Sequence, residues 1–539
     1  MFIDAGQVRA WLMDYQFWWL ELLFILFAVC TARALPPLVR SLGVGVGWWL
    51  SVAGIAALGL VAAYRVPPTT SRIYYDEQIY QNVGQNMAAL GRTQMCNHGL
   101  VQGGALECES GEYNKEPYGY PYLLSLWYRL LGTSDTIAHH VNRWAHAALA
   151  LLLAVAAVRW FGRPRAGIAA ALLISLVPEQ LRWVATAAAE PSAALFGLVA
   201  VLAAVDFSRS RTNGSLAWLL AAGAWAIQFR PESVLVAPVA AGILLLEAPS
   251  VVKDPRRPQA LAALIVPATL YLLHMIAVQH DSWGASGAAF SWSHVPGNLA
   301  VNGWYYLSDP RFPGWIALLA LSGLVAGRTS MASRAGVALY FVLFWGIFLF
   351  FYAGSYNYGA DVRYSLVSYA PLVLLAGLGV DALIARVVAW VPSRAGFATG
   401  IAMVALVAGA SPYLPHARSI GEEAWAARAD VAYAKSVATT LPEDALVLTQ
   451  DPSMFHLWGV HAAQLSYMAQ PGFVDRITAR HGGRVFVHWG FWCNVNDEVQ
   501  RQFCRDAIAG RRFEQVSAHT ERDYRFAFYR LILPTPGPG

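Results

Sequence analysis

Charged residues are scarce in this chain of 539 residues. Asp, Glu, Lys and Arg together make up 13% of the sequence, whereas 57% of the residues are hydrophobic. A typical soluble domain carries roughly a quarter charged residues. So few charges cannot cover a water-exposed surface of this size, and the mean hydropathy of +0.42 agrees. The composition therefore argues against an ordinary soluble protein and predicts a polytopic membrane protein.

Lysine is nearly absent, and so are the common nucleotide-binding motifs. The three lysines are Lys115, Lys253 and Lys435, so arginine provides almost all of the positive charge. No basic run interleaved with aromatic residues occurs, which argues against a nucleic-acid partner. The sequence also lacks the patterns GxGxxG and GxxxxGK[ST]. Their absence argues against a nucleotide-sugar donor.

The chain has five cysteines, and no two of them form a CxxC motif, which would be typical of a metal site. Cys96 and Cys108 share one polar segment, Cys493 and Cys504 share another, and Cys30 lies in an apolar run. Two pairs in two polar segments predict two disulfides and an oxidising compartment. The alternative is four unrelated free thiols.

About twelve apolar runs are candidates for membrane helices, which need about 20 apolar residues to cross a bilayer. The first run follows acidic residues and is too long for a cleaved signal sequence, so it is predicted to be a retained helix. The runs cover residues 17–35, 45–64, 139–158, 166–180, 191–206, 215–229, 233–248, 259–278, 314–327, 335–353, 366–386 and 396–412.

Arginines gather in alternate loops between these runs. Since cytoplasmic loops are enriched in Lys and Arg, the pattern predicts a multi-pass protein of the bacterial inner (plasma) membrane. Its N-terminus and C-terminal domain lie outside the cytoplasm. The basic loops contain Arg33 and Arg40; Arg159, Arg163 and Arg165; Arg209 and Arg211; Lys253, Arg256 and Arg257; Arg328 and Arg334; and Arg386 and Arg394.

Four segments follow from this topology. Residues 1–64 contain two membrane helices, and residues 65–138 form the first extracytoplasmic loop, with two amphipathic helices at the membrane interface. Residues 139–412 contain the remaining helices and loops. Residues 413–539 are predicted to form a soluble α/β domain, because ALVLTQ, RVFVHWGF and DYRFAFYRLIL are typical of strands, whereas FVDRITARHG and NDEVQRQFCRDAI are typical of helices.

Candidate functional residues lie in the extracytoplasmic loops. Asp76 and Glu77 begin the amphipathic segment YYDEQIY. Adjacent helix positions face different ways, so one of these carboxylates is expected to enter a site and the other to point elsewhere. Lys115 in GEYNKEPYGYP is the one lysine outside the cytoplasmic loops of the membrane region. It is either a solvated surface residue or a cation for a phosphate oxygen.

Further along the chain, acids and arginines recur at extracytoplasmic helix ends. Glu190 is interpreted as functional, because a carboxylate at membrane depth is costly. Glu179 is interpreted as structural. Arg230 and Arg363, the latter beside Tyr364, either extend to lipid headgroups or bind the phosphate of a lipid carrier.

These motifs resemble those of a known group. The Asp-Glu pair, the later lysine and proline, the segment YPYLLSLWYRLLGTSDTIAHHVNR, the Glu-Pro pair and the segment RYSLVSYAPLVLLAG occur in an order similar to that in GT-C membrane glycosyltransferases. The nearest branch contains the protein O-mannosyltransferases and lipid A aminoarabinose transferases. The resemblance covers roughly residues 45–385. Two departures are Lys-Glu-Pro in place of Lys-Pro-Pro, and Glu190 in place of an aspartate.

The resemblance implies a polyprenyl-phosphate sugar donor and an extracytoplasmic lipid, glycan or protein acceptor. It implies that Asp76 is the catalytic acid of the first loop and Glu190 a second catalytic acid near the site. Lys115 would contact the donor phosphate. The predicted substrate-binding residues are Glu77, Tyr113, Lys115, Arg230, Arg363 and Tyr364.

This residue set fits transfer from a sugar phosphate. A phosphate leaving group needs no proton, in contrast to the alcohol released by a glycosidase. One carboxylate that removes the acceptor proton and cations that hold the phosphate are sufficient. No cofactor is expected to be obligatory, although a divalent cation is an alternative. The other readings are a transporter or flippase of lipid-linked glycans, and a non-catalytic membrane scaffold.

Overall fold

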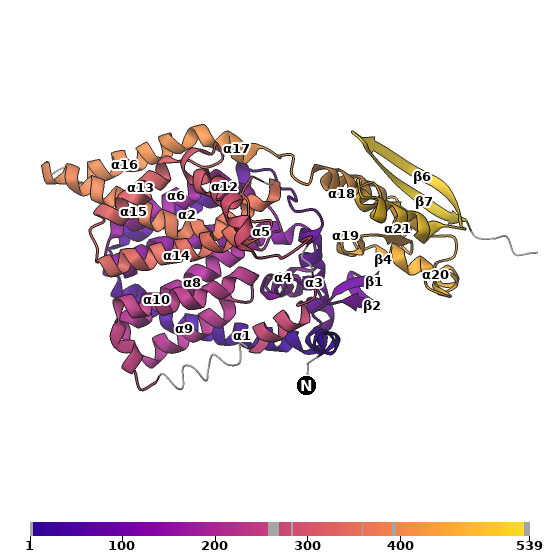
Figure 1. The fold of residues 1–539 in the computed structure, drawn as a ribbon, viewed down its shortest axis with the longest axis horizontal. Coiled ribbons are helices and arrows are strands. Elements are labelled where there is room, and N and C mark those ends of the chain that lie inside the picture. The colour runs from indigo at the N-terminus through magenta and orange to yellow at the C-terminus, as the bar shows by residue number, and fades with distance from the viewer. Residues whose placement is uncertain (1–3, 257–268, 282–283, 358, 391–394, 533–539) are drawn as a thin grey trace, which may run out of the picture.

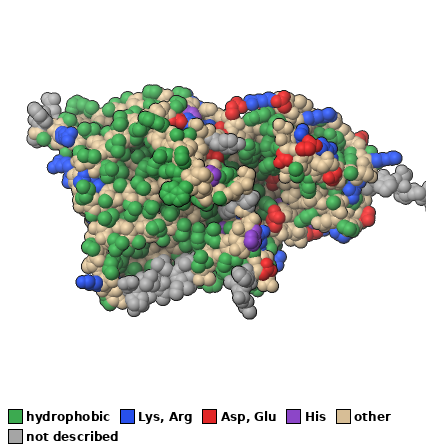
Figure 2. Space-filling view, viewed as in Figure 1, with side chains coloured by type: hydrophobic (Ala, Val, Ile, Leu, Met, Phe, Trp, Pro, Cys, Tyr) green, Lys and Arg blue, Asp and Glu red, His purple; other side chains and the backbone are tan. Residues whose placement is uncertain are grey.

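A helical body and a smaller sheet-containing domain make up the computed structural model (Figure 1). The structure describes residues 4–256, 269–281, 284–357, 359–390 and 395–532. Hydrophobic side chains cover much of the visible face of the helical body, whereas acidic and basic side chains lie close together over the C-terminal domain (Figure 2). An apolar outer surface on a helical body is expected where lipid replaces water as the solvent.

Seven helices of the described residues are long and apolar enough to cross a membrane. An eighth span arises if α6 (Pro164–Leu176) and α7 (Pro178–Val184), which meet at an angle of 64°, are counted together. Pro178 is the first residue of α7, where it leaves no amide to continue α6. Five of the seven are α1 (Ala5–Ser41), α2 (Val46–Arg65), α5 (Ile137–Phe161), α8 (Glu190–Ser210) and α14 (Met331–Phe350). The other two are the stretches Gly359–Ala389, which contains most of α15 (Leu366–Trp390), and Ala395–Arg418, which contains α16 (Ala395–Ala410).

The predicted count of about twelve membrane helices is not confirmed. Three of the predicted runs form helices of 12 to 14 residues, which are too short to span a bilayer alone. These are α9 (Asn213–Ala226), α10 (Val236–Glu247) and α13 (Trp315–Ala326). The run 259–278 lies partly outside the described residues. Within the described residues, the structure therefore supports a multi-pass protein with fewer full-length spans than the hydropathy pattern predicted.

The first long loop folds into helices α3 (Asp76–Leu90) and α4 (Gly119–Leu131) and a hairpin of β1 (Met95–Gln102) and β2 (Ala105–Glu112). Both helices were predicted, but the hairpin was not. Ten residues of α3 are buried, among them polar ones such as Asn82 and Gln85. These polar side chains contact the C-terminal domain instead of water, so α3 lies between the two parts of the molecule (Figure 1).

The C-terminal domain confirms the predicted alternation of strands and helices. A seven-stranded sheet has the order β2-β1-β4-β3-β5-β7-β6, so the hairpin of the first loop completes it. Strand β3 pairs in parallel with β4 and β5, and the other pairs are antiparallel. Its elements are α18 (Trp425–Ala438), β3 (Leu446–Thr449), α19 (Pro452–Leu457), β4 (His461–Gln464), α20 (Phe473–His481), β5 (Val485–Trp489), α21 (Glu498–Ile508), β6 (Arg512–Glu521) and β7 (Tyr524–Ile532).

Both predicted disulfides are present. Cys96 is joined to Cys108 across the hairpin, and Cys493 is joined to Cys504 in α21. Cys30 in α1 is a free thiol. The first bridge therefore ties together the two strands that the membrane loop contributes to the C-terminal sheet.

A buried ionic network fastens the start of the first loop to the chain that leads into the C-terminal domain. Glu423 accepts hydrogen bonds from Arg72 at 2.6 Å and from Arg182 at 2.8 Å. Arg182 also donates to Glu179 at 2.9 Å, and His416 on α17 (Leu414–Arg418) contacts the same carboxylate. Glu179 thus holds helices together, in agreement with its structural interpretation.

Candidate functional site

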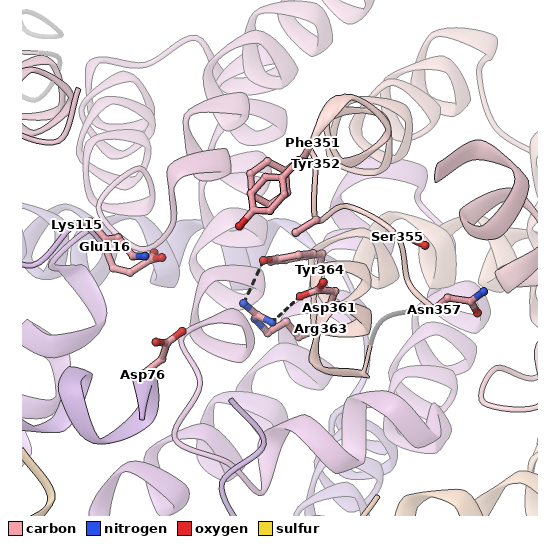
Figure 3. A pocket seen from close by; sticks show the side chains of 11 residues that line it. Asp76, Lys115, Glu116, Phe351, Tyr352, Ser355, Asn357, Asp361, Arg363 and Tyr364 are labelled. Carbon is pink, nitrogen blue, oxygen red and sulfur yellow. Dashed lines mark hydrogen bonds and ion pairs between the residues drawn. The ribbon is translucent and has the colours of Figure 1, made fainter. Parts of the chain in front are cut away.

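A cavity of about 600 Å³ opens where the first loop meets the segment after α14. Figure 3 shows its lining residues converging from three parts of the chain: the start of α3, the residues between β2 and α4, and the stretch from residue 351 to residue 364. We call this cavity the pocket. Its lining consists of Asp76, Lys115, Glu116, Phe351, Tyr352, Ala353, Ser355, Asn357, Asp361, Arg363 and Tyr364.

Asp76 enters the pocket because of where α3 begins. The carbonyl of Tyr75 accepts the first hydrogen bonds of the helix, from Gln78 at 3.0 Å and Ile79 at 2.9 Å. Asp76 is therefore the first helical residue. A carboxylate in the first turn is also favoured by the helix dipole. Its side chain points toward the centre of the pocket (Figure 3).

Glu77 faces the opposite way and does not line the pocket. Its carboxylate is buried and accepts hydrogen bonds from the backbone amides of Arg72 at 2.5 Å, Ile73 at 3.2 Å and Ala187 at 2.7 Å. Burial raises the pKa of Glu77 to about 7, and the three amides oppose that rise. Glu77 thus braces the loop in front of α3, although the sequence suggested that it binds substrate.

Arg363 lies in a short 3₁₀ helix, Gly359–Ser365, that precedes α15. Its guanidinium donates to Glu190 at 2.9 Å, to Asp361 at 3.2 Å and to the hydroxyl of Tyr364 at 3.1 Å. The Tyr364 ring stacks on Phe348 with 4.6 Å between centroids. Because carboxylates fix the guanidinium on two sides, it keeps one orientation toward the pocket.

Arg230 does not line the pocket; it lies next to Tyr364 and Glu116, which do. It donates to Glu116 at 3.2 Å and to Glu232 at 3.3 Å, and lies 3.5 Å from Glu190. Its guanidinium is also 5.8 Å from the centroid of the Tyr364 ring. Arg230 therefore links the Lys115–Glu116 segment to the start of α8.

Glu190 is the shared partner of the two arginines. Its side chain is fully buried at the first residue of α8, and Oε1 is the atom that contacts both Arg230 and Arg363. Oε2 has no hydrogen-bond partner among the residues that the structure describes. The structure thus brings Glu190 next to the pocket but behind the guanidinium groups, where it orients cations.

Lys115 and Tyr113, from the same motif, lie in different surroundings. Lys115 lines the pocket beside Glu116 (Figure 3). Burial raises the pKa of Glu116, while Arg230 opposes the rise. Tyr113 is outside the pocket lining, because its hydroxyl lies 2.8 Å from His274 and donates to Gln16 at 3.1 Å.

Several pocket residues were not singled out from the sequence. Glu116 lies inside the Lys-Glu-Pro motif, and Asp361 precedes Arg363 by two residues. Both therefore lie close to residues that the sequence identified as candidates. Phe351, Tyr352 and Ala353 lay at the end of the apolar run 335–353 that was assigned to a membrane helix, and Ser355 and Asn357 follow that run. The helix α14 ends at Phe350, and the aromatic and small residues that follow form the far wall.

The described residues contain no group of side chains suited to bind a metal ion. No three His, Cys, Asp or Glu side chains of that part of the chain gather closely enough to hold an ion. Metal independence stays a prediction from the sequence.

Comparisons with known proteins find similarity to solved structures. No protein-family model and no curated protein matches the sequence. The crystal structure of ArnT from Cupriavidus metallidurans bound to undecaprenyl phosphate is similar, with a TM-score of 0.57, 14% identity, and coverage of 92% of this chain and 100% of that one. The apo form of the same protein has a TM-score of 0.56, with 13% identity over 90% and 98% of the two chains.

ArnT is a membrane glycosyltransferase of the GT-C superfamily. At this identity the likeness concerns the fold, and it extends over the helical body and the C-terminal domain together. The chain therefore has a GT-C fold, which is the fold that the order of its motifs indicated.

Proposed function

We propose that the protein is a membrane glycosyltransferase that moves a sugar from a polyprenyl-phosphate carrier to an acceptor hydroxyl outside the cytoplasm. One observation carries the proposal: a carboxylate, Asp76, and two cations, Lys115 and Arg363, line the same pocket. The GT-C fold supports it, as does the structure of ArnT with undecaprenyl phosphate.

The reaction is a displacement at the anomeric carbon. Asp76 takes the proton of the acceptor hydroxyl while the acceptor oxygen forms a bond to that carbon. The bond between the carbon and the phosphate oxygen breaks, and the polyprenyl phosphate leaves with the electron pair. Attack from the side opposite the leaving group inverts the anomeric configuration. The acceptor is a lipid, a glycan or a protein that presents a hydroxyl.

The cations have a separate task. The donor phosphodiester carries one negative charge, and the departing monoester gains a second. Lys115 supplies a flexible point charge and Arg363 a planar set of donors whose orientation is fixed by Glu190 and Asp361. A preorganised cation stabilises the transition state most where charge develops. No step of this reaction calls for a divalent cation.

The test is transfer of radiolabel from a panel of polyprenyl-phosphate sugars by the purified full-length protein. Label moves to an acceptor or to water with the wild type, whereas Asp76→Asn lowers the rate by about 10²–10⁴-fold, the usual contribution of a positioned base. The melting temperature of Asp76→Asn stays that of the wild type. The matched control is Glu107→Gln, an exposed acid on β2 of the same loop, which keeps full activity.

Other outcomes overturn parts of the proposal. Folded wild-type protein that neither turns over nor saturably binds any lipid-phosphate sugar points to the transporter or scaffold alternative. Full activity of Asp76→Asn removes Asp76 from the reaction. Loss of wild-type turnover on chelation, with recovery on adding a divalent cation, replaces the metal-independent mechanism.

A further inference from the structure

A buried carboxylate of the C-terminal domain contacts Tyr75, the residue that directly precedes α3. Asp430 on α18 is 1% exposed. It accepts hydrogen bonds from the hydroxyl of Tyr75, from Nε2 of His488 at 2.9 Å, and from the backbone amide of Phe491 at 2.8 Å. Burying a charge is costly unless donors compensate it, and here three donors converge on the two oxygens.

The position of this carboxylate is fixed by the centre of the sheet. An ionised carboxylate only accepts, so Nε2 of His488 carries a proton toward Asp430, and Nδ1 lies 3.0 Å from the hydroxyl of Thr449. Thr449 ends β3 and His488 lies in β5, and these strands are neighbours in the middle of the sheet. Asp430 therefore has little freedom to move relative to the domain core.

Tyr75 connects this rigid part of the domain to Asp76, the next residue in the chain. Its backbone carbonyl starts α3, and its ring packs against the domain's Phe491 and Trp492, with centroids 6.2 Å and 6.0 Å away. Glu77, on the other side, accepts from the amide of Ala187 in the membrane part and from two amides of the loop before α3. Three consecutive residues thus face the domain, the pocket and the membrane part in turn.

We propose that Asp430 is a positioning residue for Asp76: by holding the Tyr75 hydroxyl, it fixes the first turn of α3 so that the Asp76 carboxylate stays aimed into the pocket. The inference rests on the proposed function, since it concerns the base of that reaction. Asp430 itself is outside the pocket lining, so it acts through Tyr75. The C-terminal domain is then a part of the active site's support.

The test begins with Tyr75→Phe, which removes the hydroxyl and keeps the ring packing. We expect kcat to fall by about 10-fold, because displacement of a catalytic group by around 1 Å can cost up to about 100-fold. KM for the donor changes less than about two-fold, since the phosphate contacts are untouched. Hydrogen exchange of the amides of residues 76–80 becomes faster, as the anchor of the turn is lost.

The matched control is Tyr524→Phe. Tyr524 stacks on Phe491 in the same aromatic cluster, at 5.6 Å between centroids, but it lies on β7 and not in front of α3. This variant retains wild-type kcat and wild-type exchange in α3. A comparable loss in both variants means that any lost hydroxyl of the cluster disturbs the fold, and it overturns the positioning role.

A double variant tests whether Asp430 affects kcat through Tyr75. If Asp430→Asn acts through Tyr75, combining it with Tyr75→Phe lowers kcat no further than the more damaging single change. Multiplying losses mean independent actions and contradict the inference. Should Asp430→Asn fail to fold, Tyr75→Phe alone decides the matter.

The two proposals fail in different ways. An inactive wild type refutes the proposed transferase, and exchange of residues 76–80 then decides whether the Tyr75 hydroxyl holds the turn. An active wild type with unchanged kcat in Tyr75→Phe refutes the positioning role and leaves the transferase standing.

Discussion

Asp76 and Glu190 are both acids beside the pocket, but their surroundings assign them different work. Asp76 lines the cavity, where an acceptor hydroxyl can reach it. Glu190 is fully buried, and its Oε1 is occupied by Arg363 at 2.9 Å and Arg230 at 3.5 Å. A carboxylate that already holds two guanidinium groups is poorly placed to accept an acceptor proton, so its contribution to catalysis runs through the arginines.

Glu190→Gln separates these roles. Loss of the charge weakens the hydrogen bond to Arg363, and bonds to charged groups are worth about 1.5–3 kcal/mol. We expect the melting temperature and kcat/KM to fall together in this variant, whereas Asp76→Asn lowers activity alone. Thermal unfolding beside the transfer assay distinguishes the two. An unchanged melting temperature with lost turnover would restore Glu190 to a direct catalytic role.

Asp451 gives the C-terminal domain a pH-dependent stability. It caps α19 by accepting from the amide of Ser453 at 3.2 Å, and its Oδ2 has no partner among the described residues. Burial raises the pKa of Asp451 to about 7, with smaller contributions of the same sign from Asp430 and Asp76. The folded protein therefore holds this proton more tightly than the unfolded chain.

The sign follows from linkage: where the folded state binds more protons, stability falls as pH rises. Asp451→Asn keeps the capping oxygen and removes the charge. Its melting temperature should exceed that of the wild type at pH 8, by a difference equivalent to a few kcal/mol. The advantage should grow between about pH 4 and pH 7 and stay constant above. A difference independent of pH would contradict the assignment.

Among the elements, the hairpin β1–β2 was missed from the sequence, although it joins the first loop to the C-terminal sheet. Its pairing with β4 is short, joining His98 to Ala463 and Gly99 to Ala462. That contact spans more than 350 residues of sequence. Because a strand gains its stability from its neighbours, a short, partly exposed segment gives little local signal when its partner is distant.

Gly99 allows the close approach of this hairpin. A Cβ at that position would lie 2.8 Å from Leu106, 2.9 Å from Cys96 and 2.9 Å from His456 on α19. Gly99→Ala should therefore lower stability by about 1–3 kcal/mol, the usual cost of overpacking. Gly483→Ala, where nothing lies within 4 Å, is the control and should be neutral. Equal melting temperatures for the two variants would show that the hairpin can shift to accommodate the added methyl group without loss of stability.

For the whole molecule, the orientation in the membrane stays a prediction from the positions of the basic residues. Basic side chains stand at the end of the helical body farthest from the C-terminal domain (Figure 2). Cytoplasmic loops are enriched in such residues. If that end lies in the cytoplasm, as predicted, the pocket and the C-terminal domain both face away from the cytoplasm.

Thiol labelling of intact cells tests the orientation. In a background of Cys30→Ala, Glu498→Cys on α21 should react with a membrane-impermeant maleimide, because Glu498 is 65% exposed. Arg328→Cys, exposed in a predicted cytoplasmic loop, should react after the cells are opened. The reverse pattern would invert the topology and place the pocket in the cytoplasm.

The sequence by itself was enough to predict that most of this protein lies in a lipid bilayer, and it identified the chemical groups of the candidate residues. Composition and hydropathy are sums over local segments, so they predicted a membrane protein with a C-terminal α/β domain. The order of short motifs likewise indicated the GT-C fold. Helix periodicity was enough to separate the directions of Asp76 and Glu77, since that geometry is local.

The tertiary structure decided what depends on partners far away in the chain. It placed Glu190 behind the arginines, removed Tyr113 from the pocket, and brought β1 and Tyr75 against the C-terminal domain. It also divided the apolar runs into full spans and short helices. A side chain's role follows from what surrounds it in space, and residues 75 and 430 become neighbours only when the chain folds.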